Sequence, residues 1–162
     1  MTEKPILFSG PMVRAILDGR KTMTRRTHRI EADRLWVRET WSYDEPQVIY
    51  RADYNGDVPP EGKWRPSIFM PRKFSRITLE ATGVRVERLQ EITEEDAIGE
   101  GVFDGGCLNC GGTQPCGCDN PVPDARDSFI WIWDSLNGKT YPWASNPFVW
   151  VIEFRRVPFT TA

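Results

Sequence analysis

The chain has 162 residues, of which 40% are hydrophobic and 12% aromatic, and its formal net charge is −2. This length suits one ordinary domain with a single core and argues against two full domains. No stretch approaches the roughly eighteen consecutive apolar residues of a membrane span, and the opening Met-Thr-Glu-Lys-Pro does not resemble a secretion signal. We therefore expect a cytoplasmic protein without a membrane partner.

The charge is distributed unevenly along the chain. Residues 1–40 carry nine Lys/Arg against five Asp/Glu, residues 71–90 carry five against two, and residues 91–134 carry one against ten. A fold that brings 1–40 and 71–90 together would have a basic face despite the acidic total. The alternative is ordinary solvated charge, and the net charge argues against a general nucleic-acid coat.

Two elements and a loop are predicted in the first part of the chain. A helix is expected from Ser9, which is suited to cap it, to Gly19, which is suited to end it. The alternation of Asp33 to Trp41 predicts a strand. The segment 42–67 is polar and rich in Pro and Gly, so it is predicted to be a long loop with at most a short strand at Val48 to Arg51.

The central segment is predicted to form a strand and a short helix. Arg76 to Leu89 reads as a strand with a bulge at Gly83, because the apolar positions change parity there. Thr93 resembles the first residue of a capping box, and Gly101 is suited to close the helix that follows. This helix carries Glu100.

The last two elements complete a mixed class. Asp127 to Leu136 has apolar residues at helical spacing and predicts a helix. Asn146 to Val157 is apolar on both faces, as expected of a strand inside a sheet or barrel. The order helix, strand, strand, helix, helix, strand predicts an α+β fold, and a small mixed barrel with flanking helices fits it best.

Four cysteines lie within twelve residues, in the run Cys-Leu-Asn-Cys-Gly-Gly-Thr-Gln-Pro-Cys-Gly-Cys. In a reducing compartment such clustering favours metal over disulfides, and four thiolates form a closed tetrahedral zinc site. We therefore predict a structural zinc within an inserted loop at 103–126; free thiols and a redox pair are the alternatives. The predicted ligands are Cys107, Cys110, Cys116 and Cys118.

The residues Ile16 to Arg26, Ile-Leu-Asp-Gly-Arg-Lys-Thr-Met-Thr-Arg-Arg, resemble the Gly-x-Lys-x-x-x-Arg signature that opens ASCH domains. These domains have a barrel related to the PUA fold of RNA-modifying proteins. Asp33 to Glu39 and Trp150 to Phe154 resemble the second and last strands of such a domain. The resemblance implies one PUA-like domain over 1–162, with insertions at 42–67 and 103–126, and it extends to ASCH proteins encoded by phages and prophages.

The resemblance also implies an activity. Small ASCH amidohydrolases that remove the acetyl group of N(4)-acetylcytidine use a lysine, a threonine and a glutamate, which fall here on Lys21, Thr24 and Glu100, with Glu39 as a second choice for the glutamate. It therefore implies recognition of RNA or a modified nucleoside, with DNA not excluded, and hydrolysis of an amide. The commoner family signature has glutamate in place of Thr24, and a non-catalytic nucleic-acid-binding module of phage origin and a ribonuclease are the alternatives.

These residue types suit amide hydrolysis without a metal. Thr24 supplies a nucleophilic hydroxyl, and Lys21 acts as its base once it is neutral, a state that burial and neighbouring like charge favour. Glu100 would orient the lysine or relay its proton, and Arg26 or backbone N–H groups would hold the oxyanion. In a regular strand Lys21 and Thr24 point to opposite faces, so the segment must turn. Substrate binding is predicted for Arg25, Arg26, Glu39 and Trp41.

Seven tryptophans exceed the needs of so small a core, and nucleic-acid bases stack on exposed aromatic rings. The stacking candidates lie in or beside the predicted loop: Trp41, Tyr50 and Trp64. The tryptophans expected in the core are Trp36, Trp133 and Trp150. The single histidine, His28, is expected to be exposed.

Overall fold

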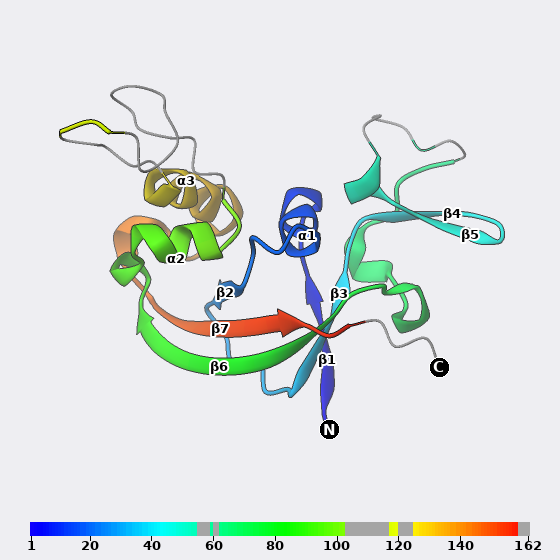
Figure 1. Cartoon of the computed structure of the whole chain (residues 1–162), viewed down its shortest axis with the longest axis horizontal. Coiled ribbons are helices and arrows are strands. Elements are labelled where there is room, and N and C mark those ends of the chain that lie inside the picture. Colours follow the sequence, from blue (N-terminus) through cyan, green and yellow to red (C-terminus); the bar gives the residue numbers. More distant parts are fainter. Residues whose placement is uncertain (55–58, 60–61, 103–116, 120–124, 159–162) are drawn as a thin grey trace. The chain divides into compact units, whose positions relative to one another are not determined.

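The computed structural model describes residues 1–54, 59, 62–102, 117–119 and 125–158. The chain divides into two compact units. The first unit comprises Met1–Asp18, Ile30–Gly83 and Phe154–Ala162, and the second comprises Gly19–Arg29 and Val84–Glu153. Two long strands, β6 (Thr78–Arg88) and β7 (Phe148–Arg156), run from one unit into the other (Figure 1). One domain over 1–162 stays a prediction.

A five-stranded sheet with the order β1-β3-β6-β7-β2 confirms the α+β class. Its remaining strands are β1 (Glu3–Leu7), β2 (Met23–Arg26) and β3 (Arg34–Arg38). Strand β1 pairs with β3 in parallel, whereas β3 pairs with β6 and β2 pairs with β7 in antiparallel fashion. In the described part of the chain the sheet does not close into a barrel, because β1 and β2 end the strand order.

Helix α1 (Gly10–Leu17) forms close to where the sequence predicts it. Ser9 is its N-cap but makes no side-chain capping bond, so that detail of the prediction is wrong. Gly19 follows the helix with a φ of +79°, a left-handed conformation that glycine adopts without a steric penalty, and it ends the helix as expected. None of the helices in the described ranges has the length and apolar character needed to cross a membrane.

The segment 42–67, predicted to be a loop, begins with a hairpin. The short strand allowed at Val48 to Arg51 is confirmed close to its predicted bounds, whereas the strand that pairs with it was not predicted. Strands β4 (Trp41–Asp44) and β5 (Gln47–Tyr50) pair antiparallel in a sheet of their own. Trp41 therefore belongs to this hairpin and not to the strand that precedes it. Aromatic packing explains the difference, because the ring of Phe74 lies 5.2 Å from that of Trp41 and 5.4 Å from that of Tyr43.

Strand β6 continues without interruption through Gly83, so the predicted bulge is wrong. The change of parity in the sequence has another cause. Val84 and Val86 are exposed, and the alternate positions on the less exposed face of the strand are occupied by Arg85 and Glu87. Charged side chains thus replace apolar ones on that face, and their partners are described below.

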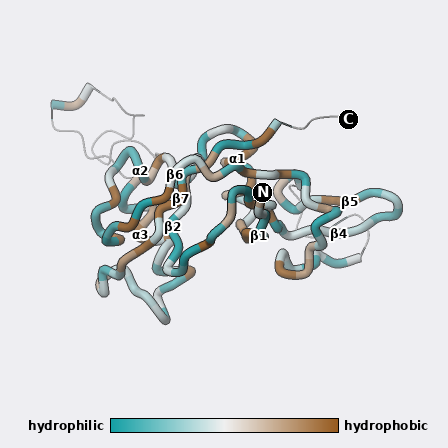
Figure 2. Tube along the Cα trace, turned by 90° about the horizontal axis from the view of Figure 1, so that it is seen from below, coloured by the Kyte–Doolittle hydropathy of each residue, from teal (hydrophilic) through white to brown (hydrophobic). Residues whose placement is uncertain are grey.

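Two helices pack on the part of the sheet that belongs to the second unit (Figure 1). They are α2 (Glu94–Gly99) and α3 (Ala125–Asn137), and both confirm predicted helices. Thr93 caps α2, since its side chain accepts a hydrogen bond from the N–H of Asp96 at 3.0 Å. Apolar stretches of α3 and β7 are brown in Figure 2. The buried core here consists of Leu89, Ile92, Ala97, Val102, Ala125, Phe129, Trp133, Val149 and Val151.

Phe129→Ala should lower the free energy of unfolding by about 3–5 kcal/mol, because it leaves a cavity where α3 packs on the core. Trp131, two residues along the same helix, is 74% exposed, against 5% for Phe129. Trp131→Ala is therefore the matched control, and it should change stability by no more than about 0.5 kcal/mol. Chemical denaturation measures both variants, and equal losses would contradict this packing of α3.

Candidate functional site

The second unit contains a cluster of buried charged side chains around Glu100. Lys21, Arg25 and Glu100 are 4%, 4% and 5% exposed. Lys21 lies in the segment between Gly19 and β2, Arg25 lies in β2, and Glu100 is the C-cap of α2. The N–H of Thr22 donates to the carbonyl of Gly99 at 2.8 Å, which fixes the lysine segment against the end of α2.

Within the described residues the Nζ of Lys21 donates three hydrogen bonds. The acceptors are the carbonyl of Met23 at 2.9 Å, the carbonyl of Glu100 at 2.7 Å and the Oε2 of Glu100 at 3.2 Å. Three acceptors match the three N–H donors of an ammonium group. Burial lowers the pKa of Lys21, and attraction to Glu100 acts in the opposite direction. Two effects therefore oppose each other at Lys21: burial favours the neutral amine, and the carboxylate of Glu100 favours the charged ammonium.

Arg25 shares Glu100 with Lys21. Its NH1 donates to the Oε1 of Glu100 at 2.9 Å, so each oxygen of this carboxylate contacts one cation. The NH2 of Arg25 donates to Glu87 at 2.6 Å and to Asp96 at 3.0 Å. Arg25 is therefore held by three carboxylates, which favours a structural role over the substrate binding predicted for it.

Arg85 extends this network at the edge of the cluster. It donates to Glu87 at 3.1 Å, to Asp96 at 3.2 Å and to Glu153 at 2.7 Å. Burial would raise the pKa of Glu87, but hydrogen bonds from Arg25 and Arg85 outweigh it and lower the pKa. These residues were not predicted from the sequence. Arg85 and Glu87 are two positions apart in a strand and therefore share a face, and this spacing of opposite charges was the signal that could have indicated a network.

Thr24 is buried in β2, opposite Ile152 of β7. Side chains alternate along a strand, so Thr24 and Arg26 lie on the face opposite to Arg25. Arg26 is half-buried, and burial lowers its pKa while Glu100 acts against the shift. Lys21 lies before the first residue of β2. The alternation of side chains along a strand therefore does not determine whether Lys21 and Thr24 point the same way.

Glu39 and Trp41 belong to the first unit and are not part of the cluster around Glu100. Glu39 accepts two hydrogen bonds from Arg76, at 3.0 and 2.9 Å. Burial raises the pKa of Glu39, and the bonds from Arg76 oppose this. Trp41 is buried, and the guanidinium of Arg65 lies 4.9 Å from its ring centre. The prediction that this ring is exposed for base stacking is therefore wrong.

The other aromatic predictions have mixed outcomes. Trp36 and Trp133 are buried, as predicted, whereas Trp150 is only half-buried. The two remaining stacking candidates, Tyr50 and Trp64, are half-buried as well. His28 is exposed, as expected.

The predicted zinc site falls mainly outside the described residues, since Cys107, Cys110 and Cys116 are not among them. Cys118 is described and half-buried. Across the described ranges, no group of three or more His, Cys, Asp or Glu side chains is arranged to hold a metal ion. The four-cysteine zinc site stays a prediction.

Comparison of the chain with protein-family models, curated proteins and solved structures gives no significant match. The site is therefore interpreted from its own geometry, and the resemblance to ASCH domains stays a prediction.

Glu100→Gln should lower the free energy of unfolding by about 3–5 kcal/mol, because it removes the buried carboxylate that is ion-paired with the Lys21 ammonium. It should also lower the pKa of Lys21 further, since attraction to Glu100 raises that pKa in the native protein. Chemical denaturation measures the stability, and NMR titration of labelled lysine Cε measures the pKa.

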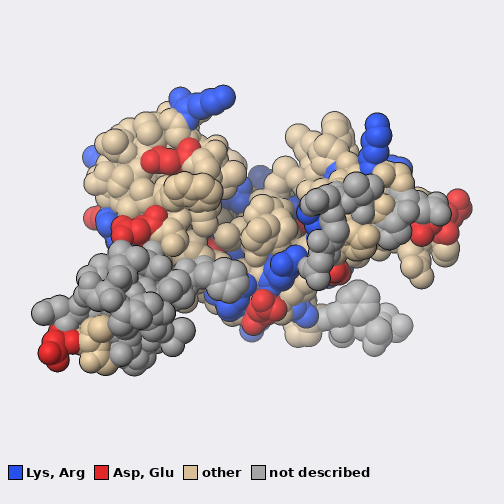
Figure 3. Space-filling view, turned by 90° about the horizontal axis from the view of Figure 1, so that it is seen from above, with Lys and Arg blue, Asp and Glu red and all other residues tan. Residues whose placement is uncertain are grey.

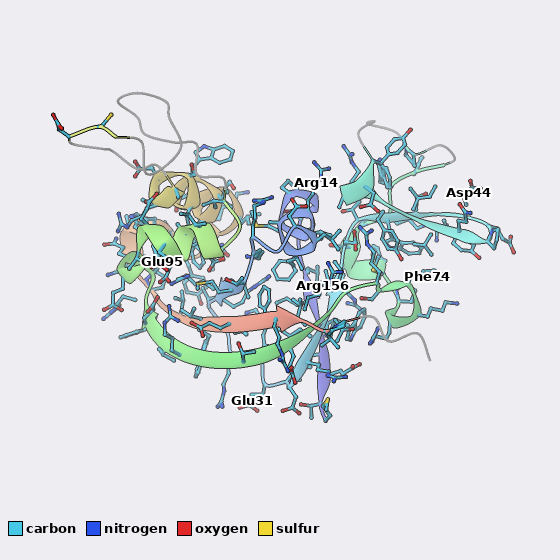
Figure 4. The ribbon with its side chains drawn as sticks, viewed as in Figure 1. Arg14, Glu31, Asp44, Phe74, Glu95 and Arg156 are labelled. Atoms are coloured by element: carbon cyan, nitrogen blue, oxygen red, sulfur yellow. The ribbon has the colours of Figure 1, made fainter. Side chains whose placement is uncertain are left out.

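Glu95→Gln is the matched control for this change. Glu95 lies in the same helix and is exposed (Figure 4). The control should leave both the stability and the Lys21 titration as they are in the native protein. A Lys21 pKa that is the same in the Glu100 variant and in the control would show that the carboxylate does not hold the ammonium in solution.

Proposed function

We propose that the protein is an ASCH-type hydrolase with a PUA-like fold, which recognises RNA or a modified nucleoside and cleaves the amide of N(4)-acetylated cytidine. The observation that carries the proposal is the buried pair of Lys21 and Glu100. These residues are 79 positions apart, and their Nζ and Oε2 atoms lie 3.2 Å from each other. The resemblance assigns both of them to one catalytic site, and their direct contact supports that assignment.

In the proposed reaction Lys21 first loses its ammonium proton to solvent, and Glu100 keeps the neutral amine in position. Lys21 then takes the proton of the Thr24 hydroxyl as its oxygen attacks the acetyl carbonyl. The tetrahedral intermediate expels the exocyclic nitrogen of cytosine, which receives the proton from Lys21. Lys21 then takes a proton from the water that attacks the acetyl-threonine ester and returns it to the departing Thr24 oxygen, so one water is consumed and cytidine and acetic acid are released.

Burial is the physical basis for the base role of Lys21. An ordinary lysine is almost wholly protonated near neutral pH, and desolvation lowers the pKa of Lys21 toward the working range of a general base. In the proposed intermediate the negative oxygen would be bound by Arg26, which belongs to the same face of β2 as Thr24. Arg25 would act on the reaction indirectly, by holding Glu100 in place.

The activity assay uses the purified protein with N(4)-acetylcytidine and follows the release of cytidine. Thr24→Val removes the hydroxyl while it keeps the shape of the side chain, and Lys21→Met removes the amine but keeps the stem. Each variant should lower kcat/KM by about a hundredfold or more. Thr24→Ser retains the hydroxyl and should keep measurable turnover, and thermal melting shows whether each variant is folded.

The pH profile tests the base role separately. Activity requires the neutral amine, so kcat/KM should rise with pH up to the pKa of Lys21. A profile that does not change through the alkaline range would contradict a lysine base. Absence of turnover in a folded native protein would contradict hydrolysis and leave the binding module as the better function.

We also propose that Cys107, Cys110, Cys116 and Cys118 bind one structural zinc ion. Four thiolates within twelve residues support this, because they complete a tetrahedral shell without an open position for catalysis. Metal analysis should find about one zinc per chain in the native protein and almost none in Cys107→Ser. If the zinc loop shapes the binding pocket, chelation should also weaken nucleoside binding; unchanged affinity in stripped protein would contradict that role.

A further inference from the structure

The first unit contains a concavity of about 250 Å³ that is lined by four arginines. They are Arg34, Arg72, Arg76 and Arg156, and the lining includes one acidic side chain, Glu3. Arg156 is labelled at the end of β7 in Figure 4. This arginine concavity is separate from the Lys21 cluster, because all of its lining residues belong to the first unit.

The sheet brings these arginines together from distant parts of the chain. Strands β3 and β6 pair so that Arg34 lies opposite Glu80 and Trp36 lies opposite Thr78. This pairing unites residues 1–40 with residues 71–90, the two segments with an excess of basic residues. Arg72 begins a 3-10 helix, Arg72–Phe74, just before β6. The sequence predicted a basic face if these two segments came together, and the arginine concavity is where they do so.

Two of the four arginines are neutralised by acidic partners. Arg76 is paired with both Glu39 and Asp53. Arg72 contacts Glu3 at 3.3 Å through side chains that are 46% and 36% exposed, and such exposed pairs exchange readily with other anions. On the face shown in Figure 3, basic and acidic side chains are likewise interspersed.

Arg34 and Arg156 differ from the other two. The Nε of Arg34 is buried without a hydrogen-bond partner, and no carboxylate in the described residues pairs with this side chain. Arg156 is exposed, and its NH1 makes a long contact of 3.4 Å with the carbonyl of Leu17. A buried donor without a partner is costly, and an acceptor bound in the concavity would satisfy the Nε of Arg34.

An aromatic ring supports the arginines on this side of the first unit. The ring of the buried Trp36 lies 4.8 Å from the guanidinium carbon of Arg38 and 5.7 Å from that of Arg72. Stacking of this kind restrains a guanidinium while it leaves the N–H donors available. Less conformational entropy is then lost when Arg72, the member of this pair that lines the concavity, binds a ligand.

We propose that the arginine concavity binds a phosphate group carried by single-stranded nucleic acid or by a mononucleotide. Arg34 and Arg156 supply donors that have no competing carboxylate, and Arg72 exchanges Glu3 for a phosphate oxygen. Guanidinium groups match the geometry of phosphate through paired N–H donors, which favours this anion. The proposal does not depend on catalysis at Lys21.

Fluorescence anisotropy with a labelled twelve-nucleotide single-stranded RNA tests the concavity directly. Arg34→Gln combined with Arg156→Gln should weaken binding by about tenfold or more, since two charge-assisted contacts are lost. The slope of log affinity against log salt should become less steep by about 0.7 for each lost contact. Arg156→Gln alone changes an exposed residue and provides a variant whose folding is not at risk.

Arg65→Gln is the matched control, because Arg65 is an exposed arginine of the first unit that does not line the concavity. It should change affinity by less than about twofold. Competition with inorganic phosphate and with cytidine monophosphate then separates the two sources: displacement at millimolar concentration shows that a single phosphate suffices, and resistance shows that several along a strand are needed.

Both of those competition results support the proposal, and two other results would overturn it. One is failure of the native protein to bind the RNA, inorganic phosphate and the mononucleotide. The other is a double variant that melts like the native protein and binds with native affinity and an unchanged salt slope. Neither result bears on turnover of acetylcytidine, so failure of this site is distinguishable from failure of the proposed hydrolysis.

Discussion

The carboxylate of Glu100 is the group on which the arrangement of the second unit depends. One of its oxygens contacts Lys21 and the other contacts Arg25, and all three side chains are buried. Removing one partner of a buried ion pair is among the more costly changes in a protein interior, so the burial of Lys21 depends on this carboxylate. Because Glu100 ends α2, the same contact joins this helix to the segment that carries the basic motif. The position of the segment that carries Lys21 and Arg25 therefore depends on a charge that the sequence places far away.

That constraint also determines what chemistry the site supports. Three acceptors hold the ammonium of Lys21 in its charged form, whereas burial favours the neutral amine. The two effects oppose each other, and a ligand that excludes water or displaces one acceptor would shift the balance toward the base. Arg25 is different, because three carboxylates hold it and a guanidinium does not lose its proton in a protein. Lysine is thus the member of the cluster whose charge state burial opposes, and arginine is held in place by its carboxylates.

The arginines of the two units differ in how far acidic side chains compensate their charge. In the second unit Arg25 and Arg85 are surrounded by carboxylates, so their charge is used within the fold. In the first unit Arg76 is compensated in the same way, but Arg34 and Arg156 have no acidic partner in the described part of the chain. Charge that is compensated internally stabilises a structure, whereas charge without a counter-ion attracts an external one. This difference places the candidate chemistry and the candidate phosphate contact in separate units, with separate residues.

Local sequence was sufficient to specify the elements that depend on neighbouring residues. Periodicity predicted α1, α3 and β7, the φ of Gly19 agrees with its predicted role as a helix stop, and the cap of α2 followed from Thr93. Lys21 and Glu100 were candidates from the resemblance of their segments alone. The β4–β5 hairpin, the exposure of Val84 and the arginine concavity, by contrast, follow from tertiary contacts. Helix periodicity and capping are encoded within a few positions, whereas strand register and buried ion pairs join residues far apart in the chain, and no local pattern specifies which partner each will meet.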